Sequence, residues 1–224
     1  MTAQERWLAT LWPTIRSRLP PSPGRVIELG CGRLGGFVPR LREHGYDALG
    51  VDPVAPEGPC YRQAEFEHTD LPHPVDAMIA CTSLHHVSDP EEVLNRMESV
   101  LAPHGVVVVV EWDWERFDEA TAQWSFERLD ESGAESWLHR HRAGWTESGL
   151  PWDEYLRGWA GRHGLHGAPS LIRGLDARFE RLTCVRGPYL FSELSQTSEA
   201  DERAAIDGGV IQALRVEYVG RPSG

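Results

Sequence analysis

The sequence predicts an α/β fold of the doubly wound, Rossmann-like kind, in which helices cover both faces of a mainly parallel sheet. Two observations lead to this prediction. Between residues 25 and 112, short apolar runs alternate with segments whose apolar residues recur at helical spacing. The first of these runs leads into an acid and a glycine-rich turn, Glu28-Leu29-Gly30-Cys31-Gly32, before a helical pattern begins. Such a turn lets the backbone approach a nucleotide-like ligand closely.

The predicted core has strands over residues 25–29, 48–52, 60–65, 75–81 and 106–111. A short helix is expected between Phe37 and Gly45, and another between Asp89 and Leu101, where Asp89-Pro90 is a typical helix start. Too few residues separate the third and fourth strands for a full crossover helix. Ahead of this core, an amphipathic helix over residues 4–19, offset at Pro13, could cap the sheet edge or close over a ligand.

The C-terminal half has a different character. Residues 112–179 are helical in parts, show no clear strand, and contain seven of the nine tryptophans. We interpret this stretch as a helical cap in which most tryptophans pack in a core and one or two contact a ligand. Further strands are expected over residues 182–185, 188–191 and 210–219, with a polar loop or short helix over residues 192–207.

Composition limits the class of protein. The 224-residue chain is 41% hydrophobic and carries a formal net charge of −12, which opposes nucleic-acid binding. No unbroken apolar run approaches the roughly 18 residues of a membrane span, and the N-terminal segment lacks the apolar stretch of a signal peptide. The four cysteines are widely spaced and match no metal-binding pattern, which favours a reducing, cytoplasmic location.

Two acids discriminate between nucleotide-like ligands. Asp52 ends the second strand, 22 positions after Gly30, where a carboxylate can accept hydrogen bonds from both hydroxyls of a ribose. NAD also carries a ribose that could bind Asp52 in this way, so this acid alone does not identify the ligand. Glu28, however, lies two residues before Gly30, where it would repel a pyrophosphate and attract a cationic amine or sulfonium. S-adenosylmethionine carries both cationic groups and no phosphate.

The chain resembles the class I S-adenosylmethionine-dependent methyltransferases, in particular their small-molecule, methyltransferase type 11-like branch. The resemblance covers residues 24–112 and the final strand pair, and it implies a seven-stranded sheet with an antiparallel last strand. Six segments carry it in order: Glu28–Gly32, Gly50–Pro53, Ala64–Phe66, Asp76–Cys81, Leu84–Pro90 and Leu101–Gly105. Two positions depart from the family pattern. The third glycine of the turn is displaced to Gly35, and Glu65 stands where aspartate is usual.

The resemblance implies how S-adenosylmethionine would be bound. Gly30 and Gly32 would lie under its methionine part, and Glu28 would hold the amino group directly or through water. Asp52 would bind the ribose hydroxyls, and Glu65 would accept from the adenine amine. The expected cofactor-binding set is Glu28, Gly30, Cys31, Gly32, Asp52, Pro53, Glu65, Phe66, Cys81, Ser83 and His86. S-adenosylhomocysteine would be the product.

The acceptor chemistry is indicated by the segment after the fourth strand. This segment reads Cys81-Thr82-Ser83-Leu84 and lacks the Asn/Asp-Pro-Pro-Tyr/Phe motif of related enzymes that methylate base or amide nitrogens. The catalytic candidates are His85, His86 and Glu111. Strands four and five are neighbours in this topology, so Glu111 should lie beside Cys81 and could orient a histidine as a general base. Alternatively, both histidines are structural and Glu111 is a polar strand end.

The predicted function is therefore methylation of a small-molecule acceptor at oxygen or nitrogen by a monomer or homodimer. Its parts would be an N-terminal helix (1–23), a cofactor-binding core (24–112), a helical cap and acceptor region (113–179) and a terminal strand pair (180–220). No metal is expected, since His139-x-His141 would diverge on a helix and His163-x-x-His166 lacks a third ligand. Two alternatives stay open: a protein side-chain methyltransferase and a non-catalytic S-adenosylmethionine-binding module.

Overall fold

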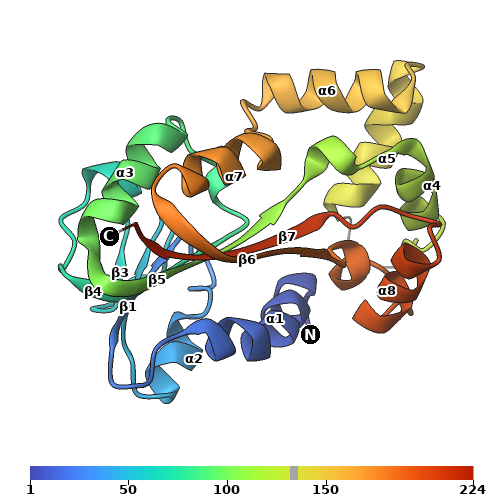
Figure 1. Ribbon diagram of the computed structural model, residues 1–224. Coiled ribbons are helices and arrows are strands. Elements are labelled where there is room, and N and C mark those ends of the chain that lie inside the picture. The colour runs from blue at the N-terminus through green and yellow to red at the C-terminus, as the bar shows by residue number, and fades with distance from the viewer. Residues whose placement is uncertain (132–135, 224) are drawn as a thin grey trace.

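The computed structural model describes residues 1–131 and 136–223, and seven strands of these residues form one sheet in the order β3-β2-β1-β4-β5-β7-β6 (Figure 1). β1 to β5 run parallel, whereas β7 is antiparallel to both β5 and β6. The predicted α/β fold with an antiparallel last strand is confirmed. The strands are β1 (Arg25–Leu29), β2 (Asp47–Val51), β3 (Tyr61–Arg62), β4 (Val75–Cys81), β5 (Leu101–Trp112), β6 (Phe179–Gly187) and β7 (Arg215–Pro222).

Helices cover the sheet on both faces (Figure 1). α1 (Ala3–Arg18) and α2 (Val38–Glu43) pack on one face, and α3 (Pro90–Val100) and α7 (Ala168–Asp176) pack on the other. The valine run of β5 shows why this strand is central. Val107 and Val109 belong to one core cluster, while Val106, Val108 and Val110 belong to the cluster on the opposite face. A strand buried on both faces has to be apolar at successive positions, which is what this run provides.

The cap lies beyond the carboxyl end of β5 and has an aromatic core of its own. It consists of α4 (Glu119–Phe126), α5 (Trp137–Ser148) and α6 (Trp152–Arg162). Helix α8 (Glu199–Asp207), which follows β6 and precedes β7 in the chain, lies beside this cap (Figure 1). Trp112 and Trp152 are buried in the cap core, and Trp124, Trp145 and Trp159 pack against it from partly exposed positions. Within the described residues, no helix combines the length and apolarity needed to cross a membrane.

Several predicted boundaries are wrong. β5 begins at Leu101 rather than at residue 106, because Leu101 still pairs with Val75 before an irregularity in the ladder. The third strand, expected over 60–65, is reduced to two residues, because only Gly50 and Val51 of β2 offer it ladder partners. Residues 188–191 form no strand, since η4 (Leu190–Ser192) is a 3-10 turn. β7 begins at residue 215 rather than 210.

Candidate functional site

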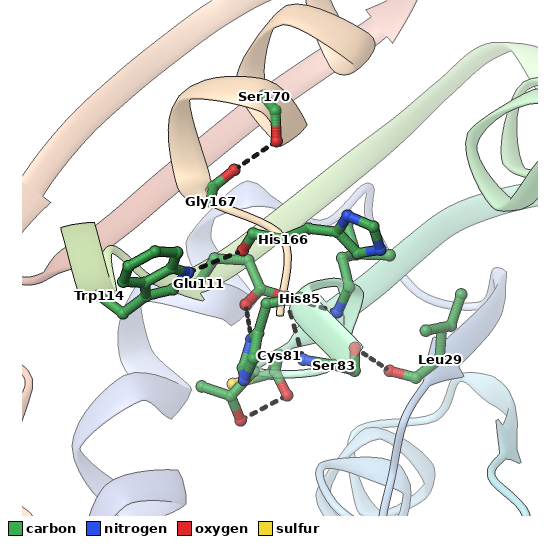
Figure 2. Close-up of polar contacts among 11 residues, drawn as sticks. Leu29, Cys81, Ser83, His85, Glu111, Trp114, His166, Gly167 and Ser170 are labelled. Carbon is green, nitrogen blue, oxygen red and sulfur yellow. Dashed lines mark hydrogen bonds and ion pairs between the residues drawn. The ribbon is translucent and has the colours of Figure 1, made fainter. Parts of the chain in front are cut away.

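The turn after β1 packs directly against the loop after β4. Gly30 has a φ of +75°, and a Cβ at this position would lie 2.2 Å from Cβ of Ser83. The Ser83 hydroxyl also donates to the Leu29 carbonyl at 3.1 Å (Figure 2). At Gly36, with a φ of +55°, a Cβ would lie 2.1 Å from Oε1 of Glu28. Only glycine fits both positions, so the turn can pack closely against Ser83 and over Glu28.

Glu28 is the buried acid beneath this turn, with 1% of its surface exposed. Its Oε2 accepts hydrogen bonds from the backbone N–H groups of Phe37 (2.7 Å) and Val38 (3.1 Å) at the start of α2. No described residue donates to its other oxygen, Oε1. Burial raises the pKa of Glu28 to about 8, although the two N–H groups oppose the shift. The acid therefore has one engaged oxygen and one that is available to a ligand.

The predicted cofactor-binding residues surround two adjoining cavities. The turn cavity, of about 200 Å³, lies between the glycine turn and α1, and its lining includes Glu28, Gly30, Cys31 and Cys81. The strand-end cavity, of about 450 Å³, is lined by Gly30, Gly32, Asp52, Pro53, Glu65, Phe66, Ser83 and His86, among others. Gln4, Gly30 and Thr82 line both. Every residue expected to bind the cofactor thus lies around one continuous region.

Asp52 is positioned by the backbone at the edge of the strand-end cavity. Its Oδ2 accepts from the Gly32 N–H at 2.9 Å, and its Oδ1 accepts from the Val54 N–H at 2.8 Å. Each carboxylate oxygen retains capacity for a further hydrogen bond. Glu65, in contrast, is exposed, and Phe66 beside it is buried. At the strand ends, the Asp52 side chain is therefore held in one orientation, whereas the exposed Glu65 side chain can change its conformation.

His85 and Glu111 form a buried pair, as the neighbouring ends of β4 and β5 led us to expect. The two side chains point toward one another (Figure 2), with His85 Nδ1 2.5 Å from Glu111 Oε2. Glu111 Oε1 also accepts from the backbone N–H groups of Ser83 (3.0 Å) and Leu84 (2.7 Å). With Nδ1–H donating to the carboxylate, the lone pair of His85 lies on Nε2, and no described residue bonds to that atom.

His86 has a different environment from His85. Its ring lies 4.1 Å from that of His85, but no carboxylate bonds to it. Partial burial lowers the pKa of His86 to about 4. Burial also raises the pKa of the Cys31 and Cys81 thiols, so neither is a thiolate near neutral pH. The group with an oriented, available nitrogen is therefore His85.

A third cavity, the aromatic cavity, adjoins the other two and has a volume of about 350 Å³. It shares Thr82 and His86 with the strand-end cavity, and Thr82, Trp137 and Tyr189 with the turn cavity. Its lining is Thr82, His85, His86, Trp112, Trp137, Arg140, His141, Trp159, Leu165 and Tyr189. His85 therefore lies on the wall of a cavity that opens toward both of the predicted cofactor cavities.

Comparison with known protein families assigns the chain. A family model described as a methyltransferase domain matches residues 4–152, well over half of the sequence. The chain belongs to this methyltransferase family. It is an S-adenosylmethionine-dependent methyltransferase of class I, and S-adenosylmethionine is its cofactor, as the sequence resemblance predicted. A comparison with curated proteins finds no match.

Solved structures agree with the fold of this methyltransferase. An S-adenosylmethionine-dependent methyltransferase from Mesorhizobium loti is 18% identical, with a TM-score of 0.56 and coverage of 94% of this chain and 97% of the other. The N-methyltransferase NodS from Bradyrhizobium japonicum WM9, in complex with S-adenosylhomocysteine, is 15% identical (TM-score 0.55, coverage 100% and 89%). Geranyl diphosphate C-methyltransferase from Streptomyces coelicolor is 14% identical (TM-score 0.55, coverage 96% and 80%). At these identities the likeness concerns the fold alone.

The methyltransferase positions Tyr189 through a residue that the sequence did not single out. Glu202 of α8 is fully buried and accepts hydrogen bonds from three successive backbone N–H groups, those of Tyr189, Leu190 and Phe191. Burial raises the pKa of Tyr189 well above its usual value, and the nearby Glu111 adds to the shift. The Tyr189 hydroxyl therefore stays protonated between the turn cavity and the aromatic cavity. No sequence signal identified this arrangement.

The histidines of the two pairs considered as metal ligands have other contacts. His139 Nδ1 accepts from the Ser136 N–H, and His141 Nδ1 lies 3.3 Å from the Tyr155 hydroxyl. His163 Nδ1 lies 2.8 Å from the Trp159 carbonyl. His166 connects the α6–α7 loop to the His85 segment, since its backbone N–H donates to the His85 carbonyl at 3.0 Å. In the described ranges, no three His, Cys, Asp or Glu side chains form a potential metal site.

Proposed function

We propose that this methyltransferase methylates an oxygen or nitrogen atom of a small-molecule acceptor and that His85 takes up the acceptor's proton. The observation that carries the proposal is the buried His85–Glu111 pair, on the wall of the aromatic cavity and next to the strand-end cavity. The aromatic cavity would hold the acceptor, and the other two cavities would hold the cofactor.

The charges around the two cofactor cavities fit S-adenosylmethionine. Glu28 and Glu193 line the turn cavity, while Asp52, Glu65 and Glu67 line the strand-end cavity. The described lining of both contains no lysine or arginine. Such surroundings favour a ligand with cationic groups and disfavour a pyrophosphate. In this proposal the free oxygen of Glu28 contacts the amino group and Asp52 binds the ribose hydroxyls, while Gly30 and Gly32 leave room for the methionine part.

The chain's own contribution to the reaction is positioning and proton transfer. S-adenosylmethionine supplies an already activated methyl group, so no covalent nucleophile is required of the protein. With its proton on Nδ1, His85 would accept the acceptor's proton at Nε2, and Glu111 would stabilise the imidazolium formed. Glu111 is itself fixed by two backbone N–H groups, so the histidine is oriented before the acceptor arrives. General-base catalysis of this kind contributes roughly 10²–10⁴ in rate.

In the proposal, His86 positions the ligands and leaves proton transfer to His85. It lines both the strand-end cavity and the aromatic cavity, and its pKa of about 4 keeps it neutral at physiological pH. A base with so low a pKa removes a hydroxyl proton poorly. His86 therefore fits a wall between cofactor and acceptor, where it can donate or accept one hydrogen bond without carrying charge.

The proposal is tested by screening a metabolite library for release of S-adenosylhomocysteine by mass spectrometry. With the acceptor in hand, His85→Gln should lower the turnover rate by about 10²–10⁴ while leaving S-adenosylhomocysteine affinity within about threefold of the parent. The matched variant His86→Gln should lower turnover by less than about tenfold. Equal losses in both variants, or full turnover by His85→Gln, would contradict the assignment.

A further inference from the structure

We infer that the aromatic cavity takes a hydroxylated aromatic acid as the methyl acceptor, with the hydroxyl at His85 and a carboxylate at Arg140. The inference rests on the proposed function, since it assigns the acceptor to this cavity. Three features of the described lining carry it: flat ring walls, a limited volume and the guanidinium of Arg140.

Trp112 is the centre of the ring walls. Its ring lies almost parallel to that of Tyr189, at 7° with centroids 6.1 Å apart, and at centroid distances of 5.3 Å from Trp137 and 6.3 Å from Trp159. Flat faces of this kind favour stacked or edge-on contacts with another ring. The volume of about 350 Å³ limits the size of that ring system. A cavity of about 150 Å³ suffices for benzene, so a substituted single ring or a bicyclic system fits.

Arg140 determines the sign of the ligand's charge. It is exposed, lies on α5 beside the cavity, and makes no ion pair with a described residue. Two histidines of the lining, His86 and His141, do not add to its charge near neutral pH, because burial lowers the pKa of each to about 4. Arg140 also acts on Glu193, because its charge lowers the pKa of that acid against the larger effect of burial. The guanidinium on the described wall of this cavity favours an anionic ligand. A carboxylate matches its planar donor geometry.

A cationic amine is the main competing ligand, because tryptophan faces also attract cations. Arg140 opposes this alternative by like-charge repulsion inside a partly desolvated cavity. The two ligand classes can therefore be separated by compounds that share a hydroxyphenyl ring and differ only in the second substituent. Suitable probes are para-hydroxybenzoate, its neutral methyl ester and para-hydroxybenzylamine, with a hydroxynaphthoate as the bicyclic acid.

The test is equilibrium binding of these probes to the full chain saturated with S-adenosylhomocysteine. Binding is measured by calorimetry and by tryptophan fluorescence. We expect at least one of the two acids to bind about tenfold or more tightly than the ester, and the amine to bind weakest. Arg140→Gln should bring the affinity of that acid to within about threefold of the ester. The matched control is Arg157→Gln, at an exposed position of α6 where the arginine pairs with Asp153. This substitution should change neither the affinity of the acid nor that of the ester.

Equal binding of acid and ester, tighter binding of the amine, no binding of either acid at millimolar concentration, or an acid preference that survives in Arg140→Gln would each overturn the inference. S-adenosylhomocysteine binding is titrated separately. If the chain prefers the acid but does not bind S-adenosylhomocysteine, the ligand class inferred here is supported and the cofactor assignment is overturned.

Discussion

Glu28 offers the sharpest test of how the cofactor is bound, through the proton that this acid would lose. Burial holds its pKa at about 8, so in the free protein roughly 0.9 of the molecules carry a proton on Glu28 at pH 7. Contact with the ammonium group of the cofactor requires the ionised carboxylate. Binding of S-adenosylhomocysteine at pH 7 should therefore release about 0.9 proton from this site.

The same linkage sets the pH dependence of affinity. Each pH unit below 8 adds about 1.4 kcal/mol to the cost of ionising Glu28. The dissociation constant should therefore fall about tenfold between pH 6 and pH 7 and level off above pH 8. Glu28→Gln retains an oxygen that can accept from the N–H groups of Phe37 and Val38 but has no proton to lose. Its affinity should be nearly flat over this range.

Isothermal titration at pH 7 in buffers of different ionisation enthalpy counts the released protons directly. The matched control is Glu65→Gln, which removes an exposed acid from the neighbouring cavity and should preserve the release. If the parent chain releases no proton, or if Glu28→Gln releases as many as the parent, the ammonium contact assigned to Glu28 is wrong.

Three further substitutions test the rest of the site. Gly30→Ala should cost about 2–4 kcal/mol of stability through its positive φ and the clash with Ser83, whereas Gly161→Ala, with open space around it in α6, should be neutral or slightly stabilising in the same thermal melts. Asp52→Ala should weaken S-adenosylhomocysteine binding at least about tenfold by calorimetry, and unchanged affinity would refute the ribose assignment. Glu202→Ala leaves three backbone N–H groups unpaired, so the melting temperature should fall by roughly 6–12 °C; a smaller change would mean that solvent replaces the carboxylate.

The central strands could be predicted because burial leaves a local signature. Residues 25–29 and 75–81 form strands with the bounds expected, since each is a short apolar run delimited by turn residues. The start of β5 was missed because Pro103 and Gly105 are typical of turns. There the pairing of Leu101 with Val75, which is a contact distant in sequence, extends the strand through them. The residues around Leu101 in the sequence do not reveal a strand partner that is so distant along the chain.

The candidate site also contains some residues that the sequence could indicate and others that it could not. Glu28, Asp52 and Glu111 could be singled out because the ends of parallel strands meet at one edge of the sheet. Glu202 could not, since its surroundings in the sequence are those of an exposed acidic helix, and only the tertiary structure brings it to the backbone at Tyr189. The role proposed for Arg140 likewise depends on which helices of the cap face the sheet.

The measurement that most directly tests the central claim is chemical rescue of His85→Ala by imidazole. If His85 is the proton acceptor held by Glu111, the variant should bind S-adenosylhomocysteine normally and turn over slowly. Added imidazole should then raise its rate by about tenfold or more, with saturation, while leaving His86→Ala unchanged. If imidazole gives no rescue in a variant that still binds the cofactor product, or restores both variants equally, proton transfer does not pass through His85.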